Sequence, residues 1–390
     1  MTEEHGDGGW VNLNHVFRVI KNVGKGGCQF LWGSEKGDGG ISQIYKYQWE
    51  GTEGEAKEIG RVTGGTGVAE GVIGYDYQSG VCYCVGNVAA GGRWGERHVI
   101  ASKDGKDDVV SGDWGGWNVA AMDGKCRYAV CKSSGVGEVQ RARVFKKDDN
   151  TGTWEVVKEI GRGLGGEDLV SPEMGSFRNR EGTELFYSLY KPDESVHGKG
   201  PHPLVVSVYG GPHVQRVNSS WSQNADMRAQ MLRSMGFAVV KCDNRGGARR
   251  GRDFELEIKG DMGNKEVDDQ VDCVKHVTGV LKVGDKNRVG VVGWSYGGYM
   301  SAMCLAKVRF DPRHYEWRNL RMLVLPYKTH LLRNRRNNSL PSSQPFSRFS
   351  SLIAGTRRLP RRHQRGTCDN LDGVRHALHG EVHGTAVGER

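Results

Sequence analysis

Three short apolar runs alternate with helical stretches in the second half of the chain, and this pattern constrains the fold more than any other feature. The runs Leu204–Val208, Ala238–Cys242 and Val289–Val292 have the length and β-branched composition of strands buried on both faces. Alternating strands and helices predict a doubly wound α/β domain with a mostly parallel sheet, which we place at residues 166–307. The predicted helices and their apolar positions are Asn224–Ser234 with Met227, Met231 and Leu232, and Glu266–Val277 with Val267, Val271 and Val274.

The third run leads directly into Gly293-Trp294-Ser295-Tyr296-Gly297, a GxSxG motif between a strand and a helix. This is the arrangement of a nucleophile elbow, in which a sharp turn exposes the serine hydroxyl above the sheet. We expect Gly293 and Gly297 to be required because a Cβ at either position would clash. Ser295 is the candidate nucleophile, and the Tyr296 amide is a candidate oxyanion donor at the helix N-terminus. The alternative is a glycine-rich turn in which Ser295 only caps the helix.

Two further motifs follow the first two strands. Tyr209-Gly210-Gly211-Pro212 forms a tight loop, and its residues fit a plain turn as well as they fit a tyrosine that donates a hydrogen bond into a cleft. Asp243 and Arg245 follow the next strand, and we expect them to pair with each other in a structural role.

The first half of the chain repeats a strand, a Gly/Ser-rich turn and a second strand, beginning at Phe30, Tyr83 and Tyr128. Asp76–Cys84 and Asp123–Cys131 read as matching hairpins. The spacing of about 45 to 55 residues is typical of four-stranded propeller blades. We therefore predict about three blades in residues 1–165, an incomplete propeller, and a linker around Gly161–Gly166.

Composition excludes several classes of protein. The nine scattered cysteines lack the spacing of a zinc site or of a disulfide framework, so we expect reduced thiols and a cytoplasmic protein with no metal and no cofactor. Cys82 and Cys84 fit buried packing better than a metal site. No apolar run is long enough to span a bilayer, and no membrane partner is expected. The net charge of +9 arises in residues 308–390, which carry 16 Lys and Arg against 6 Asp and Glu, whereas residues 1–307 carry 39 against 40.

The motifs resemble, in order and spacing, the dipeptidyl peptidase IV family of the prolyl oligopeptidase clan. The matching segments are SVYGGPHVQ, CDNRGGARRGRDFE, DMGNKEVDDQV and VGWSYGGYMSAMCLAK, while GWVNLNHVF and GERHVIASK are similar to the cytosolic type 8 and type 9 branch. The resemblance implies an α/β hydrolase preceded by a propeller, peptide substrates, and release of N-terminal dipeptides after proline or alanine. It makes Ser295 the nucleophile, with the Tyr209 hydroxyl and the Tyr296 amide as the oxyanion hole. Members of this family often form homodimers.

The C-terminal region departs from this pattern. The family's triad Asp and His should follow the serine, but residues 308–390 do not read as hydrolase, and no triad Asp or His is identified. Back-translated and read from the second base of each codon, Arg358–Gly384 can spell the family's YD…YTE…YMG segment. We infer a frameshift upstream of codon 358, which leaves Val374 and Leu378 in place of two pocket tyrosines. Residues 308–352 fit neither frame.

Without a base the serine is a weak nucleophile, so we expect this chain to be inactive or nearly so. The alternative function is a non-catalytic protein whose propeller and basic tail bind partners. Its arginine clusters could contact phosphates, but the inferred shift of reading frame explains them better. Nucleic acid is therefore not an expected partner. The tail histidines and carboxylates are not expected to replace the triad, because out-of-frame residues have no selected geometry; they are His363, His376, His379, His383, Asp369 and Asp372.

Overall fold

The computed structural model describes residues 10–12, 16–24, 26–51, 54–65, 67–88, 94–166, 168–310 and 321–322. These ranges fall within the first of two structural units, Met1–Ser339, and the second unit, Leu340–Arg390, lies outside them. The predicted frameshifted segment, 358–384, therefore lies outside the described residues. Within the described residues, no helix is both long and apolar enough to cross a membrane.

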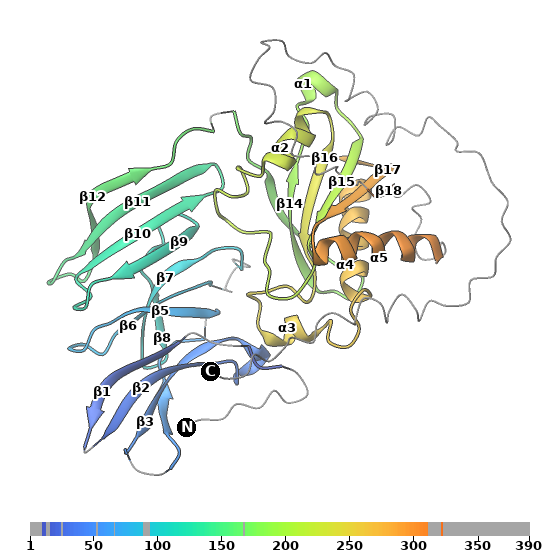
Figure 1. Ribbon diagram of the computed structural model, residues 1–390. Coiled ribbons are helices and arrows are strands. Elements are labelled where there is room, and N and C mark those ends of the chain that lie inside the picture. Colours follow the sequence, from blue (N-terminus) through green and yellow to red (C-terminus); the bar gives the residue numbers. More distant parts are fainter. Residues whose placement is uncertain are drawn as a thin grey trace, which may run out of the picture. The chain divides into compact units, whose positions relative to one another are not determined.

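The first half of the chain forms three four-stranded antiparallel sheets, each built from consecutive strands in sequence order (Figure 1). The three predicted strand–turn–strand segments correspond to β2–β3, β6–β7 and β10–β11. The strand β12 continues through Arg162, so the predicted linker begins at Gly163 and not at Gly161. The strands are β1 Phe17–Val23, β2 Gly27–Ser34, β3 Gln43–Trp49, β4 Lys57–Arg61, β5 Ala69–Tyr75, β6 Cys82–Gly86, β7 His98–Lys103, β8 Lys106–Val109, β9 Trp117–Met122, β10 Tyr128–Gly135, β11 Glu138–Lys147 and β12 Trp154–Arg162.

In each of the matching hairpins, an aspartate side chain accepts hydrogen bonds from backbone amides of the turn. Asp76 Oδ1 accepts the amides of Gln78 and Ser79 between β5 and β6. Asp123 Oδ1 accepts the amides of Arg127 and Tyr128 between β9 and β10. A short acidic side chain that satisfies turn amides is the usual reason for aspartate at such a position.

Neighbouring sheets share apolar cores. One core joins Leu31 and Ile44 of the first sheet to Cys82 and Cys84 of the second. Another joins the second sheet to Phe145 and its neighbours in the third. Cys82 and Cys84 are buried with free thiols, and burial raises the pKa of Cys84 to about 12. The described residues hold no cluster of three or more metal-ligating side chains and no closed ring of sheets.

The second half of the described chain forms one six-stranded sheet in the order β13-β14-β16-β15-β17-β18. The pairs β15–β16, β15–β17 and β17–β18 are parallel, whereas β13–β14 and β14–β16 are antiparallel. Helices connect the parallel strands, as the alternating pattern predicts. The elements are β13 Glu173–Arg178, β14 Glu184–Tyr190, α1 Glu194–His197, β15 His202–Val208, α2 Met227–Ser234, β16 Ala238–Asp243, α3 Arg252–Leu256, α4 Lys265–Lys275, β17 Gly284–Gly293, α5 Tyr296–Phe310 and β18 Arg321–Met322.

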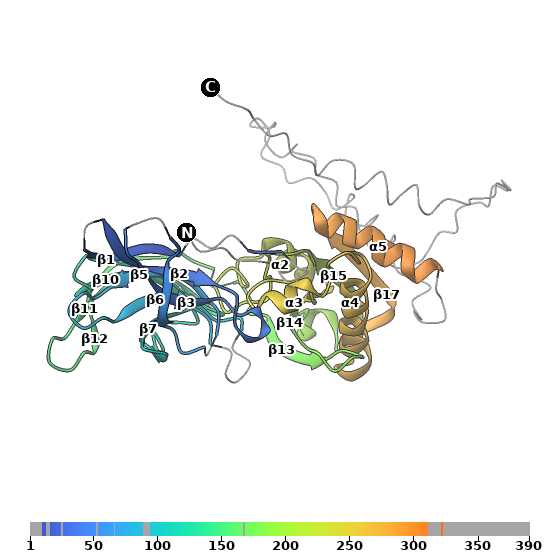
Figure 2. The ribbon, with the colours of Figure 1, turned by 90° about the horizontal axis from the view of Figure 1, so that it is seen from below.

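One face of this sheet is covered by α4 and α5, which lie on the same side in both views (Figures 1 and 2). Val267, Val271 and Val274 of α4 are buried there against Val206 and Val240, as predicted. Each fully buried valine contributes about 1.5–3 kcal/mol relative to exposure. Their burial accounts for the position of α4 despite its acidic sequence.

The other helix prediction is wrong in part. The helix α2 packs on β14 and β16 through Ala229 and Leu232, which are both buried. Met227 and Met231 lie on its outer side and are 63% and 44% exposed. Because α2 has only two turns, the side that faces the sheet holds few side chains. Ala229 and Leu232 occupy it, and the two methionines are left on the outer side.

Candidate functional site

The register of the two central strands brings the predicted site residues to one edge of the sheet. In the β15–β17 pair, Val208 lies opposite Gly293. The residues that follow, Tyr209 and Trp294, therefore leave the sheet side by side. In open α/β sheets this carboxyl edge of the strands is the usual place for a binding crevice.

Ser295 occupies a sharply turned corner between β17 and α5. Its φ is +55°, a left-handed conformation that costs a non-glycine residue about 1–2 kcal/mol. Its carbonyl oxygen accepts the amides of Gly298 and Tyr299 as α5 begins, and its side chain is exposed. A strained, exposed serine at the head of a helix is the geometry that a nucleophile elbow requires.

The two glycines of the motif allow this corner to form. A Cβ at Gly293 would lie 2.1 Å from the carbonyl oxygen of Gly297, and a Cβ at Gly297 would lie 2.3 Å from that of Val208. Both obstacles are backbone atoms of the turn or of β15. Neither can move without disrupting the sheet edge, so glycine is required at both positions.

Tyr209 and Tyr296 lie close together above the elbow, with ring centroids 6.1 Å apart. The Tyr296 hydroxyl donates to Oε1 of the fully buried Glu266 at 2.8 Å, and burial raises the pKa of Tyr296 well above its usual value, with the carboxylate adding to the rise. The Tyr296 amide finds no acceptor, and the half-buried Tyr209 hydroxyl finds no hydrogen-bond partner, among the residues that the structure describes. Among these residues both groups are donors without an acceptor, and the Tyr296 amide directly follows Ser295 in the chain.

The loop that carries Tyr209 is held by contacts that sequence reasoning missed. The Asn244 side chain donates to the carbonyl oxygen of Gly210 at 2.9 Å, and Gln270 of α4 donates to Asn244 Oδ1 at 2.8 Å. The Asp243 carboxylate accepts the amides of Arg216 and Val217, both at 2.8 Å. Burial raises the pKa of Asp243 to about 6. The only sequence signal was the cluster of short polar residues directly after β16.

The expected pair between Asp243 and Arg245 does not form. Asp243 faces the amides of the 209–217 loop, whereas Arg245 turns to the opposite side, toward α4. There its guanidinium contacts Asp269 at 2.9 Å, and Glu181 accepts a second set of hydrogen bonds. The arginine and Asp269 are 2% and 0% exposed, so this is a fully buried ion pair.

The described residues place no base on the candidate nucleophile. Among the described ranges, no histidine or carboxylate hydrogen-bonds with Ser295. The tail histidines His363, His376, His379 and His383, together with Asp369 and Asp372, lie outside the described residues, as do Val374 and Leu378. The geometry thus contains an elbow and two free donors.

Comparison with known proteins shows what this part of the chain is similar to. The prolyl oligopeptidase family profile matches residues 222–312, which include α4, the elbow and α5. The chain is 43% identical to mouse and to human dipeptidyl peptidase 8 over 138 residues. Residues 222–312, which include the elbow, are therefore similar to the prolyl oligopeptidase family. The fold in this region is that of an α/β hydrolase.

The relatives are much longer than the segments that match this chain. The dipeptidyl peptidase 8 matches cover 35% of this chain and 15% of either relative. A probable dipeptidyl-aminopeptidase B of Paracoccidioides lutzii is 26% identical over 309 residues, which cover 76% of this chain and 32% of that protein. The chain therefore spans less than a third of these relatives, all of which carry dipeptidyl peptidase names.

Proposed function

We propose that the chain is the nucleophile-bearing part of a serine peptidase that releases N-terminal dipeptides after proline or alanine through an acyl-enzyme. In this proposal Ser295 attacks the peptide carbonyl, and the Tyr209 hydroxyl and Tyr296 amide stabilise the oxyanion. The observation that carries it is the exposed Ser295 at φ +55°, followed by the Tyr296 amide, which has no acceptor among the described residues. The names of the relatives support the dipeptide specificity.

We further propose that the chain as written is inactive or nearly so. A serine hydroxyl needs an adjacent base to act as a nucleophile at neutral pH. Loss of the base from such a triad costs on the order of 10⁶ in kcat. The absence of a base beside Ser295 among the described residues supports this part of the proposal.

A fluorophosphonate probe tests the proposal, because it labels only an activated serine. We expect the full chain to be labelled no faster than Ser295→Ala, while human dipeptidyl peptidase 8 labels readily under the same conditions. Hydrolysis of a dipeptidyl-proline substrate should likewise stay at the level of the Ser295→Ala control. Rapid labelling that Ser295→Ala removes would contradict the inactivity and support the nucleophile.

A change of reading frame is the proposed reason why no triad Asp or His is identified in the sequence after Ser295. We expect transcripts sequenced across codons 300 to 360 to show an insertion or deletion. The corrected frame should then continue past codon 390 into an Asp and a His at family spacing. Transcripts that all carry the given frame without interruption would rule out this cause.

Two finer assignments belong to the same proposal. The three four-stranded sheets are blades of an incomplete propeller, supported by their sequential order, by their shared cores, and by Val119, Val130 and Val156 on the last sheet, each about half exposed. Cross-links that place the first and third sheets next to each other would contradict this order. The location is cytoplasmic, supported by eight described cysteines that are all free, seven of them buried. Cell fractionation would test it.

A further inference from the structure

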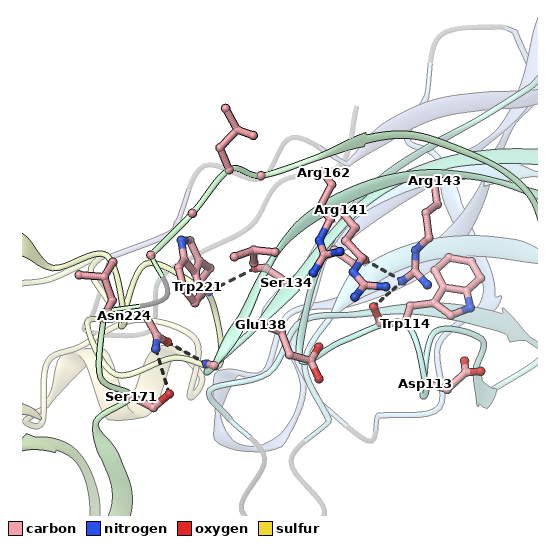
Figure 3. A pocket seen from close by; sticks show the side chains of 18 residues that line it. Asp113, Trp114, Ser134, Glu138, Arg141, Arg143, Arg162, Ser171, Trp221 and Asn224 are labelled. Carbon is pink, nitrogen blue, oxygen red and sulfur yellow. Dashed lines mark hydrogen bonds between the residues drawn. The ribbon is translucent and has the colours of Figure 1, made fainter.

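A pocket of about 780 Å³ lies beside the sheet β9–β12, away from the elbow (Figure 3). One wall comes from β10, β11 and β12 with the turn before β9, and another comes from residues 163–166 and from Trp221 and Asn224. Hydrogen bonds connect the walls: Asn224 accepts the Gly137 amide at 2.8 Å, and Ser134 accepts the Trp221 amide at 3.3 Å. The volume is within the range of small-molecule sites, roughly 300–1,000 Å³.

Three arginines gather on one side of this pocket (Figure 3). Arg141 and Arg143 are two residues apart on β11 and so share a face of the sheet. Arg162 of β12 lies directly opposite Arg141 in the antiparallel pair. Like charges at directly opposite positions destabilise a sheet. An anion bound between the two guanidinium groups would remove this repulsion.

No carboxylate neutralises these charges. Within the described part of the chain, none of the three arginines forms an ion pair, although Asp113 and Glu138 also line the pocket. Glu159, which lies opposite Arg143 in the strand register, forms no ion pair with it. The pocket therefore presents three positive groups whose counter-charge is not supplied by the described residues around them.

Arg143 is held in place through its Nη2, while its buried Nε is unused. Its Nη2 donates to the carbonyl oxygen of Trp114 at 2.7 Å and to Ser133 Oγ at 2.9 Å. Its guanidinium lies 5.2 Å from the ring of Phe145, which stacks on Trp114. The buried Nε has no hydrogen-bond partner. A buried donor without an acceptor costs free energy, and such groups in native proteins call for an explanation such as a ligand.

We propose that this pocket binds a small molecule carrying two or more phosphate groups. Guanidinium groups bind phosphate through paired N–H donors, and three of them on one wall match a ligand with several phosphate oxygens. Ser133 and Ser134 add hydroxyl groups to the same wall. The site is separate from Ser295 and independent of peptidase activity.

Isothermal titration of the full chain with inorganic pyrophosphate tests the proposal. The key variant is Arg141→Ala with Arg162→Ala, because both side chains are exposed and their loss relieves repulsion. We expect about tenfold weaker binding for each guanidinium lost. The matched control is Arg61→Ala, an exposed strand arginine outside the pocket, which should bind as the wild type does. Binding to the wild type should weaken as the salt concentration rises.

Each outcome decides the proposal. Saturable binding that the double variant loses and Arg61→Ala retains supports it. Equal binding by the double variant, or no binding of pyrophosphate or tripolyphosphate by the wild type, overturns it. Binding of a glutamate-rich peptide in the absence of pyrophosphate binding would overturn the ligand class. If circular dichroism shows that the double variant is unfolded, Arg162→Gln alone should still weaken binding about tenfold, and unchanged binding would overturn the site.

Discussion

Gly297→Ala is expected to unfold the hydrolase domain or to lower its free energy of unfolding by more than about 4 kcal/mol, the range of severe overpacking. The added Cβ would lie 2.3 Å from the carbonyl oxygen of Val208 and 3.1 Å from the Cα of Tyr209. Relief would require β15 to separate from the elbow, which would break the pairing of Val208 with Gly293. Urea unfolding followed by tryptophan fluorescence measures the loss.

Gly279→Ala is the matched control for this experiment. Gly279 lies in the helical turn His276–Val280, and a Cβ there would meet nothing within 4 Å. Alanine is favoured over glycine in a helix by up to about 1 kcal/mol, so this variant should be as stable as the wild type or slightly more so. A Gly297→Ala protein that unfolds within 1 kcal/mol of the wild type would show that the elbow is not as tight as the structure has it.

The second large effect is expected at the buried ion pair between Arg245 and Asp269. Arg245→Met should lower the free energy of unfolding by about 3–5 kcal/mol, because it leaves a buried carboxylate without its counter-charge. Asp269 would keep only the hydrogen bonds from the Asn179 side chain and from the backbone amide of residue 245. Burial already raises the pKa of Asp269, and the arginine offsets part of this rise.

A double-mutant cycle isolates the pair from the rest of the fold. The Arg245→Met, Asp269→Leu double variant should lose less stability than the sum of the two single variants, since it leaves no buried charge unpaired and the Glu181 carboxylate is half exposed. As a control, Lys191→Met breaks the exposed pair with Glu173 and should cost at most about 1 kcal/mol. Additive losses in the cycle would mean that Arg245 and Asp269 act independently.

Much of the α/β domain could be predicted because its signals are local. Apolar runs such as Leu204–Val208 predict buried strands, and the valines of Glu266–Val277 are at helical spacing. The elbow was readable for the same reason, since the conformation at Ser295 depends on the two glycines within two residues of it. Each of these predictions needed only a short window of sequence.

The contacts that the sequence did not predict join residues far apart in the chain. The partner of Arg245 is Asp269, which lies 24 residues away on α4. Nothing in the sequence around Arg245 indicates that it pairs with Asp269 and not with Asp243. The contact of Asn244 with Gly210 spans 34 residues, and the link between Tyr296 and Glu266 spans 30. Such contacts depend on how the strands order themselves in the sheet, which no local pattern encodes.

The sequence by itself determined three buried strands, two of the helices that pack on them, where the chain turns sharply, and which serine stands at that turn. Its information is periodic and short-range, because side-chain burial repeats every two residues in a strand and every 3.6 in a helix. Only the tertiary structure decided which buried charges pair. It also decided the register that places Arg141 opposite Arg162 at a pocket. These depend on strand register and helix packing, which arise from the whole domain at once.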